Sequence, residues 1–138
     1  HYNYDSISQF LRKMDTIYTE NEVQKLKDTQ YRLIWFDAIR FPISDFVKIF
    51  FAQQGYKDGL HGLVMSILQA FYSFVVFAKL WEANKFEENE ITLQEIGKQF
   101  KWTNKEMTYW QLTEEGKEET DVIRKYINKL KVWYATHR

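Results

Sequence analysis

The 138-residue sequence contains no cysteine and a single proline, Pro42, and its 19 basic and 19 acidic side chains cancel. The lack of cysteine excludes a disulfide framework and any thiolate metal site. Because proline is so scarce, we expect long helices rather than many turns. The zero net charge argues against a nucleic-acid partner, which usually requires a basic surplus.

The sequence also lacks a recognisable catalytic set. It has no Asp-x-Asp pair, and its glycines precede no strand-to-helix turn of the kind that cradles phosphate. His1, His61 and His137 lie far apart, and none has a histidine partner four residues away, so no zinc site is predicted. We therefore assign no catalytic residue, no metal ligand and no cofactor to this chain.

The chain is organised around residues 55–82, where a glycine-rich turn opens the most apolar segment. Gly55 is expected to end the preceding helix in a left-handed conformation, which glycine adopts readily. Asp58 has two interpretations: a cap of the next helix, which is the commoner role, or an acid beside a bound head group or acceptor. The candidate acceptor-side or structural turn comprises Gly55, Asp58, Gly59, His61 and Gly62.

Residues 60–81 are predicted to form one helix of about six turns. Its small and weakly polar residues fall on one side, where another helix backbone can approach closely. We call this side the small-residue seam; it comprises Gly62, Ser66, Gln69 and Ser73. The helix is about long enough to span a bilayer, but its polar residues fit a re-entrant, interfacial or buried position better.

The phenylalanine-rich residues 31–54 precede the turn. Pro42 disfavours helical backbone at Phe41, so a kink or break is expected there, with a second helix from about Ile43. Phenylalanines beside basic side chains suit a helix in a bilayer interface, although an ordinary core helix has the same pattern. The side chains expected to face the membrane are Phe46, Phe50, Phe51, Phe71, Phe74 and Trp81, and those expected to contact head groups are Arg40, Lys48, Lys57 and Lys79.

The two ends of the chain are also predicted to be helical. Near the amino terminus, Asp5 or Ser6 caps a first helix, and Thr19 with Glu22 forms a capping box for a second. Residues 87–138 carry ten acidic and nine basic side chains, which indicates a solvated tail. The starts and breaks predicted for helices in this tail are a capping box at Thr92 and Glu95, a start at Thr103 or Asn104, an interruption at Gly116, and a cap at Thr120 or Asp121.

Residues 1–85 together resemble the C-terminal portion of family 2 glycosyltransferases related to the lipopolysaccharide-core β-glucosyltransferases. The shared pattern is a His-Tyr lead, a Tyr-Thr helix, a Gly-x-x-Asp-Gly-x-x-Gly turn after a phenylalanine-rich helix, and an apolar helix closing on Lys-Leu-Trp-Glu. The matching residues are His1, Tyr18, Thr19, Gly55, Asp58, Gly59, Gly62, Tyr72, Lys79, Trp81 and Glu82.

The resemblance implies an enzyme that moves a sugar from a nucleotide donor to a lipid-linked or envelope-glycan acceptor at the cytoplasmic face of the cell membrane. It also implies that the donor-binding domain, with its nucleotide sugar, divalent metal and catalytic base, precedes His1. The present chain would then dock the enzyme on membrane lipids and shape the acceptor side.

The fold class predicted is all-α, with several amphipathic helices around one long apolar helix and a polar helical tail. Residues 1–30 are interpreted as the helical end of the transferase domain, residues 31–85 as a membrane-associating helical hairpin, and residues 86–138 as a charged helical tail. Two alternatives stay open. The chain could be a helical membrane-association module without enzymatic activity, or a soluble interaction domain whose apolar helix is its core.

Overall fold

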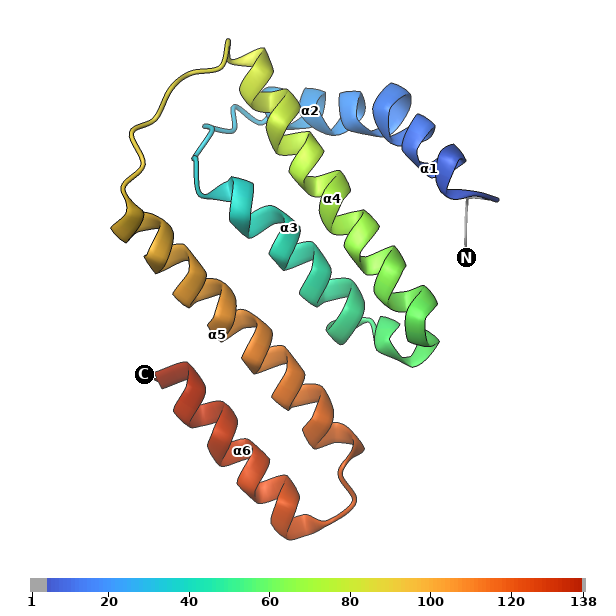
Figure 1. Cartoon of the computed structure of the whole chain (residues 1–138), viewed down its shortest axis with the longest axis vertical. Coiled ribbons are helices and arrows are strands. Elements are labelled where there is room, and N and C mark those ends of the chain that lie inside the picture. Colours follow the sequence, from blue (N-terminus) through green and yellow to red (C-terminus); the bar gives the residue numbers. More distant parts are fainter. Residues whose placement is uncertain (1–4, 138) are drawn as a thin grey trace.

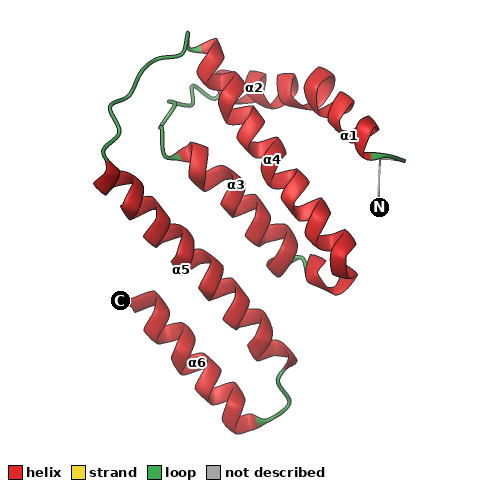
Figure 2. Cartoon of the chain, in the orientation of Figure 1, coloured by secondary structure: helices red, strands yellow, loops and turns green. Residues whose placement is uncertain are grey.

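A computed structural model describes residues 5–137, apart from the side chains of residues 17 and 18. The described residues form helices and connecting loops and contain no strand, which confirms the all-α prediction (Figure 2). The α-helices are α1 (Ile7–Lys13), α2 (Thr19–Asp28), α3 (Asp37–Val47), α4 (Gly59–Ala83), α5 (Leu93–Glu118) and α6 (Val122–His137).

The helices form two hairpins that lie side by side. In the order α4, α3, α5 and α6, four helices follow one another across the molecule, and α2 crosses the C-terminal half of α4 (Figure 1). The first hairpin pairs α3 with α4, and the second pairs α5 with α6. Contact between α3 and α5 joins them. The apolar helix α4 is thus packed on one side by α3 and across its end by α2.

The segment before α3 is one helical arm rather than two capped helices. Ser6 caps α1 as predicted, because its Oγ accepts a hydrogen bond from the amide of Gln9 at 3.1 Å. The capping box predicted at Thr19 is wrong, because a π-helical turn (Met14–Tyr18) carries α1 into α2 without a break. Thr19 is fully buried, and its hydroxyl donates to the carbonyl of Met14 instead of capping a new helix.

Helix α3 begins before the proline and continues through it. Residues 31–36 are loop and turn, and the helix then runs from Asp37 past Pro42 to Val47. The helix is therefore not broken at Pro42, and the separate start predicted at about Ile43 is wrong. Proline removes one backbone donor, and the packing of α3 along α4 offsets that loss. A second π-helical turn (Lys48–Ala52) follows directly.

The tail contains fewer interruptions than predicted. The capping box at the start of α5 is confirmed, since Thr92 Oγ1 accepts from the amide of Glu95 while the carboxylate of Glu95 accepts from the amide of Thr92. The start predicted at Thr103 or Asn104 and the interruption predicted at Gly116 are wrong, because α5 is continuous from Leu93 to Glu118. Asp121 precedes α6 and accepts from the amide of Ile123 at 2.8 Å, as predicted for the final cap.

The core is small and lies where α2 crosses α4. The buried residues that form a cluster at this crossing are Val23 of α2 and Val76 and Leu80 of α4, and further buried apolar residues are Phe10, Met14, Val47 and Phe77. Partly buried neighbours pack around the cluster, namely Leu26, Tyr31, Leu33 and Tyr72. Much of the remaining apolar surface of α4 therefore lies outside the core.

Candidate membrane-docking face

The small-residue seam of α4 faces inward, against α3. Gly62, Ser66 and Ser73 are buried, and Ser66 is completely inaccessible to solvent. The Ser66 hydroxyl donates to the carbonyl of Gly62 at 2.7 Å, which satisfies it within the helix. The Ser73 hydroxyl donates to the carboxylate of Asp45, so one side-chain hydrogen bond links α4 to α3. The seam predicted from the sequence is the face on which the two helices meet.

The glycine turn is held together by close backbone contacts. A Cβ on Gly62 would lie 1.7 Å from the carbonyl oxygen of Gly55, and a Cβ on Gly55 would lie 2.9 Å from the carbonyl oxygen of Ile49. Gly55 is not the left-handed cap that we predicted. Gln54 takes that conformation, with a φ of 60°, and Gly59 has a φ of 59°. The turn needs glycine at Gly55 and Gly62 for space and at Gly59 for its backbone conformation.

The two polar residues of the turn lie at its surface. Asp58 occupies the N-cap position of α4, as predicted, but its side chain makes no capping hydrogen bond. His61 is exposed one residue beyond Leu60. Their proposed role beside an acceptor stays a prediction.

The outward face of α4 is a continuous apolar stripe. Counting from Leu60, it recurs at intervals of four and three residues, so it follows one side of the helix. We call this set the outer stripe: Leu60, Val64, Ile67, Phe71, Phe74, Ala78 and Trp81. Its large members are between 38% (Trp81) and 77% (Leu60) exposed. Three of these residues were predicted to face the membrane, and the rest could have been found from the same spacing.

A phenylalanine cluster lies beside the glycine turn, at the same end of the hairpin. Phe46 stacks on Phe50 with ring centroids 5.2 Å apart, and Phe50 meets Phe51 edge to face at 5.1 Å. All three side chains are partly buried. Part of the surface of each ring is therefore buried against its neighbours. Contact of these rings with a membrane stays a prediction.

An apolar groove of about 400 Å³ lies beside the outer stripe, between α3, α4 and the linker to α5. Phe74 and Trp81 of the stripe line it, and the linker contributes Glu87 and Glu88 at its edge. Trp81 also donates its indole N–H to the carbonyl of Glu87 at 2.8 Å, which fixes the linker over the groove. Sequence reasoning missed this groove because it depends on where residues 84–92 return across the hairpin.

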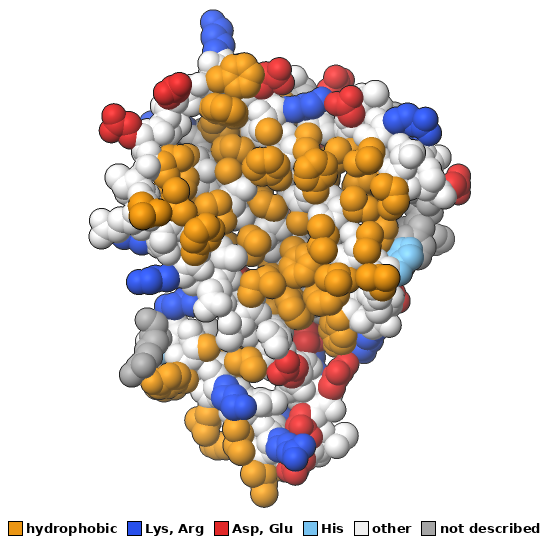
Figure 3. Space-filling view, viewed as in Figure 1, with side chains coloured by type: hydrophobic (Ala, Val, Ile, Leu, Met, Phe, Trp, Pro, Cys, Tyr) orange, Lys and Arg blue, Asp and Glu red, His pale blue; other side chains and the backbone are white. Residues whose placement is uncertain are grey.

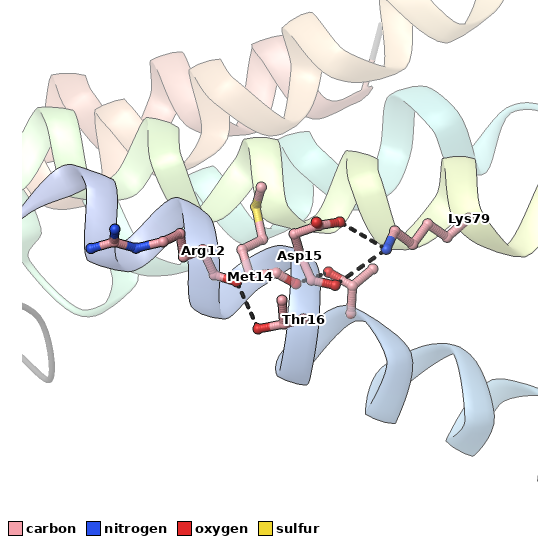
Figure 4. A network of polar contacts seen from close by, with 6 residues as sticks. Arg12, Met14, Asp15, Thr16 and Lys79 are labelled. Atoms are coloured by element: carbon pink, nitrogen blue, oxygen red, sulfur yellow. Dashed lines mark hydrogen bonds and ion pairs between the residues drawn. The ribbon is translucent and has the colours of Figure 1, made fainter.

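The four basic residues predicted to contact head groups lie in different surroundings. The ammonium of Lys79 lies 3.0 Å from a carboxylate oxygen of Asp15 and 3.2 Å from its carbonyl, and so ties α4 to the first helical arm (Figure 4). The guanidinium of Arg40 lies over the rings of Phe36 and Trp102 and belongs to the contact between hairpins. Lys48 and Lys57 are exposed, and Lys57 also donates to Gln54 at 3.0 Å.

The turn is also anchored to α5 through a buried carboxylate. Glu114 is only 3% exposed and lies 2.5 Å from the ammonium of Lys117. Tyr56 donates its hydroxyl to Glu114 at 3.3 Å. Burial, together with the negative charges of Glu118 and Glu114, raises the pKa of Tyr56 to about 12. Tyr56 therefore keeps its proton and remains a donor at neutral pH.

The apolar surface over the first hairpin is broad. Figure 3 shows apolar side chains gathered over the part of the molecule where α2, α3 and α4 lie. Among the described residues, one helical segment, Gly55–Ala83, is long and apolar enough to cross a membrane, judged by length and composition. Only 28% of its most apolar window is buried inside the structure. A core helix of a soluble domain would be mostly buried.

Scans against protein-family models, curated proteins and solved structures each found no match to this chain. The likeness to family 2 glycosyltransferases thus rests on the sequence pattern alone. Of the residues that carry it, His1 and the side chain of Tyr18 lie outside the described part of the molecule. Within that part, no group of three or more histidine, aspartate or glutamate side chains is placed to hold a metal ion.

Proposed function

We propose that this chain docks a glycosyltransferase on the membrane, with the outer stripe of α4 as the lipid contact. The observation that carries the docking role is the arrangement of α4: its small residues Gly62, Ser66 and Ser73 are buried, while the large apolar residues of the outer stripe point outward. In water this arrangement leaves the apolar area unburied, whereas in a bilayer interface that area is covered by acyl chains.

The energy available from the outer stripe is sufficient for docking. Full burial of a large aliphatic or aromatic side chain is worth roughly 1.5–3 kcal/mol, so a half-exposed one gains about 1 kcal/mol more on entering lipid. The six large residues of the stripe together offer about 6 kcal/mol. This is enough for stable but reversible association, which suits a peripheral or monotopic helix lying in the interface.

The sugar-transfer role rests on the resemblance of residues 1–85. Under this proposal, a domain ahead of His1 binds the nucleotide sugar and its divalent metal at the cytoplasmic face of the membrane. The docked hairpin then presents the lipid-linked or envelope-glycan acceptor to that domain. The groove beside Trp81 supports this reading, because its apolar walls and acidic edge suit an acyl or prenyl chain with a cationic or hydroxylated neighbour.

Flotation of the 138-residue chain with vesicles of phosphatidylcholine alone, which carry no net charge, tests the docking role. The parent chain should float, and Ile67→Asp with Phe71→Asp should leave it at the bottom of the gradient. These residues are 52% and 46% exposed, so both changes are compatible with the fold. The matched control is Leu93→Asp with Phe100→Asp, since these residues of α5 are 85% and 61% exposed and lie outside the stripe. Equal flotation of all three proteins would refute the proposal.

The longer polypeptide tests the enzymatic role. If a nucleotide-sugar domain precedes this chain, the stripe variant should lose transfer to a membrane-embedded acceptor yet retain slow hydrolysis of the nucleotide sugar. Absence of such a domain would leave the alternative function, a helical module without enzymatic activity. The regular four-three spacing of the outer stripe favours a helical protein partner in that case, because such spacing also forms helix-pairing seams. A stable complex between this chain and a helical protein, formed by a chain that does not float with vesicles, would identify the non-enzymatic alternative.

A further inference from the structure

Helix α6 exposes its apolar side to solvent and turns its other side toward α5. The half-buried residues of α6 are Asn128, Val132, Ala135 and Thr136. On the opposite side, large apolar residues recur at helical spacing and are between 45% and 80% exposed. We call them the α6 stripe: Val122, Ile123, Tyr126, Ile127, Leu130, Trp133 and Tyr134.

The charge of α6 is of one sign. Residues of the helix include Arg124, Lys125, Lys129 and Lys131 and no aspartate or glutamate, although the rest of the tail is rich in acidic residues. At 3.6 residues per turn, the α6 stripe covers an arc of roughly 140°. Lys129 borders this arc on one side, and Lys131 and Arg124 border it on the other. All these basic side chains are exposed.

We propose that α6 is a second and independent membrane contact, which binds anionic lipid by lying in the plane of the bilayer surface. Basic residues that flank an apolar arc can extend upward to head-group phosphates while the arc enters the acyl region. Trp133 and Tyr126 lie within that arc, and such rings favour the depth at which water meets lipid. Anionic lipid, rather than lipid in general, is selected because every charged group on this helix is a cation.

A second copy of α6 fits this surface less well than an anionic bilayer does. Two α6 stripes packed face to face would bring their bordering lysines and arginines together, with no acidic residue on either helix to neutralise them. An anionic surface neutralises the same groups. The charge of the helix therefore distinguishes the two occupants.

The test measures binding of the 138-residue chain to vesicles of phosphatidylcholine alone and of phosphatidylcholine mixed with phosphatidylglycerol. Each lysine at an anionic surface contributes about fivefold in affinity, so Lys129→Gln with Lys131→Gln should weaken binding to the anionic vesicles about 25-fold. Binding to the neutral vesicles should not change. The matched control is Lys98→Gln with Lys101→Gln, which removes two exposed charges from α5 and should leave both affinities unchanged.

A second variant tests the apolar part without altering the basic residues. Leu130→Gln, a neutral change at a position 56% exposed, should weaken binding to anionic vesicles while the helical circular dichroism is retained. The proposal is overturned if the lysine variant and its control bind anionic vesicles equally. It is also overturned if sedimentation shows a dimer that is dissociated by Leu130→Gln but not by added anionic vesicles.

The outcomes for α6 and for the outer stripe of α4 can be told apart. Loss of binding to neutral vesicles in the Ile67→Asp and Phe71→Asp variant reports on the outer stripe alone. If that variant still prefers anionic vesicles, α6 acts independently, as proposed. If it loses every form of binding, α6 is not an independent contact, even though the docking role of α4 stands.

Discussion

The two hairpins of this molecule both turn large apolar side chains outward, but they hold their own helices together differently. In the α3–α4 hairpin, buried Gly62, Ser66 and Ser73 allow close approach, and a serine–aspartate hydrogen bond crosses the interface. In the α5–α6 hairpin, a cleft of about 420 Å³ lies between the helices, and lysine stems line part of it. The interface of the first hairpin is lined by small residues, a pattern that lets helices approach closely in membrane proteins, and that of the second is lined by longer, partly polar side chains.

This difference in packing accompanies a difference in the residues that border each apolar surface. A hairpin whose interface is lined by small residues can leave large apolar residues exposed along its other side, as in the outer stripe. A hairpin closed by long side chains keeps a basic border, as α6 does. Under the proposals above, the first hairpin supplies apolar binding energy and the second supplies the preference for anionic lipid.

The largest expected effect comes from filling the space at Gly62. Gly62→Ala places a methyl group 1.7 Å from a backbone oxygen that cannot move aside as a side chain would. We expect the free energy of unfolding to fall by about 3 kcal/mol, measured by urea denaturation. Gly97→Ala is the matched control, since its methyl group meets no atom within 4 Å, and it should stabilise α5 by up to about 1 kcal/mol. If Gly62→Ala and Gly97→Ala changed the free energy of unfolding by similar amounts, the two hairpins would be packed alike at these glycines.

The next effect concerns the contact that joins the hairpins. The guanidinium of Arg40 lies 4.3 Å from the ring centroid of Phe36 and 4.9 Å from that of Trp102, and its Nε donates to Gln99 at 2.9 Å. Arg40→Lys keeps the charge but loses the planar stacking and this donor, which should cost about 1 kcal/mol.

Hydrogen exchange locates the consequence of that change. Amides of α5 should exchange faster in Arg40→Lys, while those of α4 should not, because the interface between α3 and α4 is untouched. Arg32→Lys, at an exposed loop position, is the control and should alter neither helix. Faster exchange in both hairpins would mean that they unfold as one unit rather than two.

The sequence pattern predicted the features that depend on neighbours along the chain. The seam of α4, the capping box before α5 and the position of the long apolar helix all follow from spacing and from side-chain chemistry within one turn. Errors occurred where distant contacts outweighed a local preference. Pro42 and Gly116 weaken a helix by themselves, yet α3 and α5 continue through them because each helix is packed along its length by another.

The candidate site divides in the same way. Phe71, Phe74 and Trp81 could be placed on one side of α4 from spacing alone, and they do lie on the outer stripe. The partners of Arg40 and Lys79 could not be foreseen, because Gln99 and Asp15 are 59 and 64 residues away in the sequence. The exposure of α6 was equally hidden, since its spacing predicts an apolar side but does not reveal that α5 leaves that side uncovered.

The smallest expected effect concerns the start of α5 in the second hairpin, compared with the start of α4 in the first. Hydrogen bonds from the backbone amide and hydroxyl of Thr92 lower the pKa of Glu95, whereas Asp58 at the start of α4 makes no side-chain cap hydrogen bond. Because the folded pKa is the lower one, the contribution of Glu95 is present above its unfolded pKa of about 4.3 and is lost as pH falls through the folded pKa.

Glu95→Gln keeps the geometry of the capping box but removes the titrating group, so it is the matched variant. The parent should be more stable than this variant at about pH 6, and the difference should shrink as the pH falls through the folded pKa of Glu95, as measured by urea unfolding. Exchange of the first-turn amides of α5 should rise over the same interval in the parent alone. A stability difference that persists at low pH would show that Glu95 acts through packing rather than charge. The start of α5 would then be no more sensitive to acid than the start of α4.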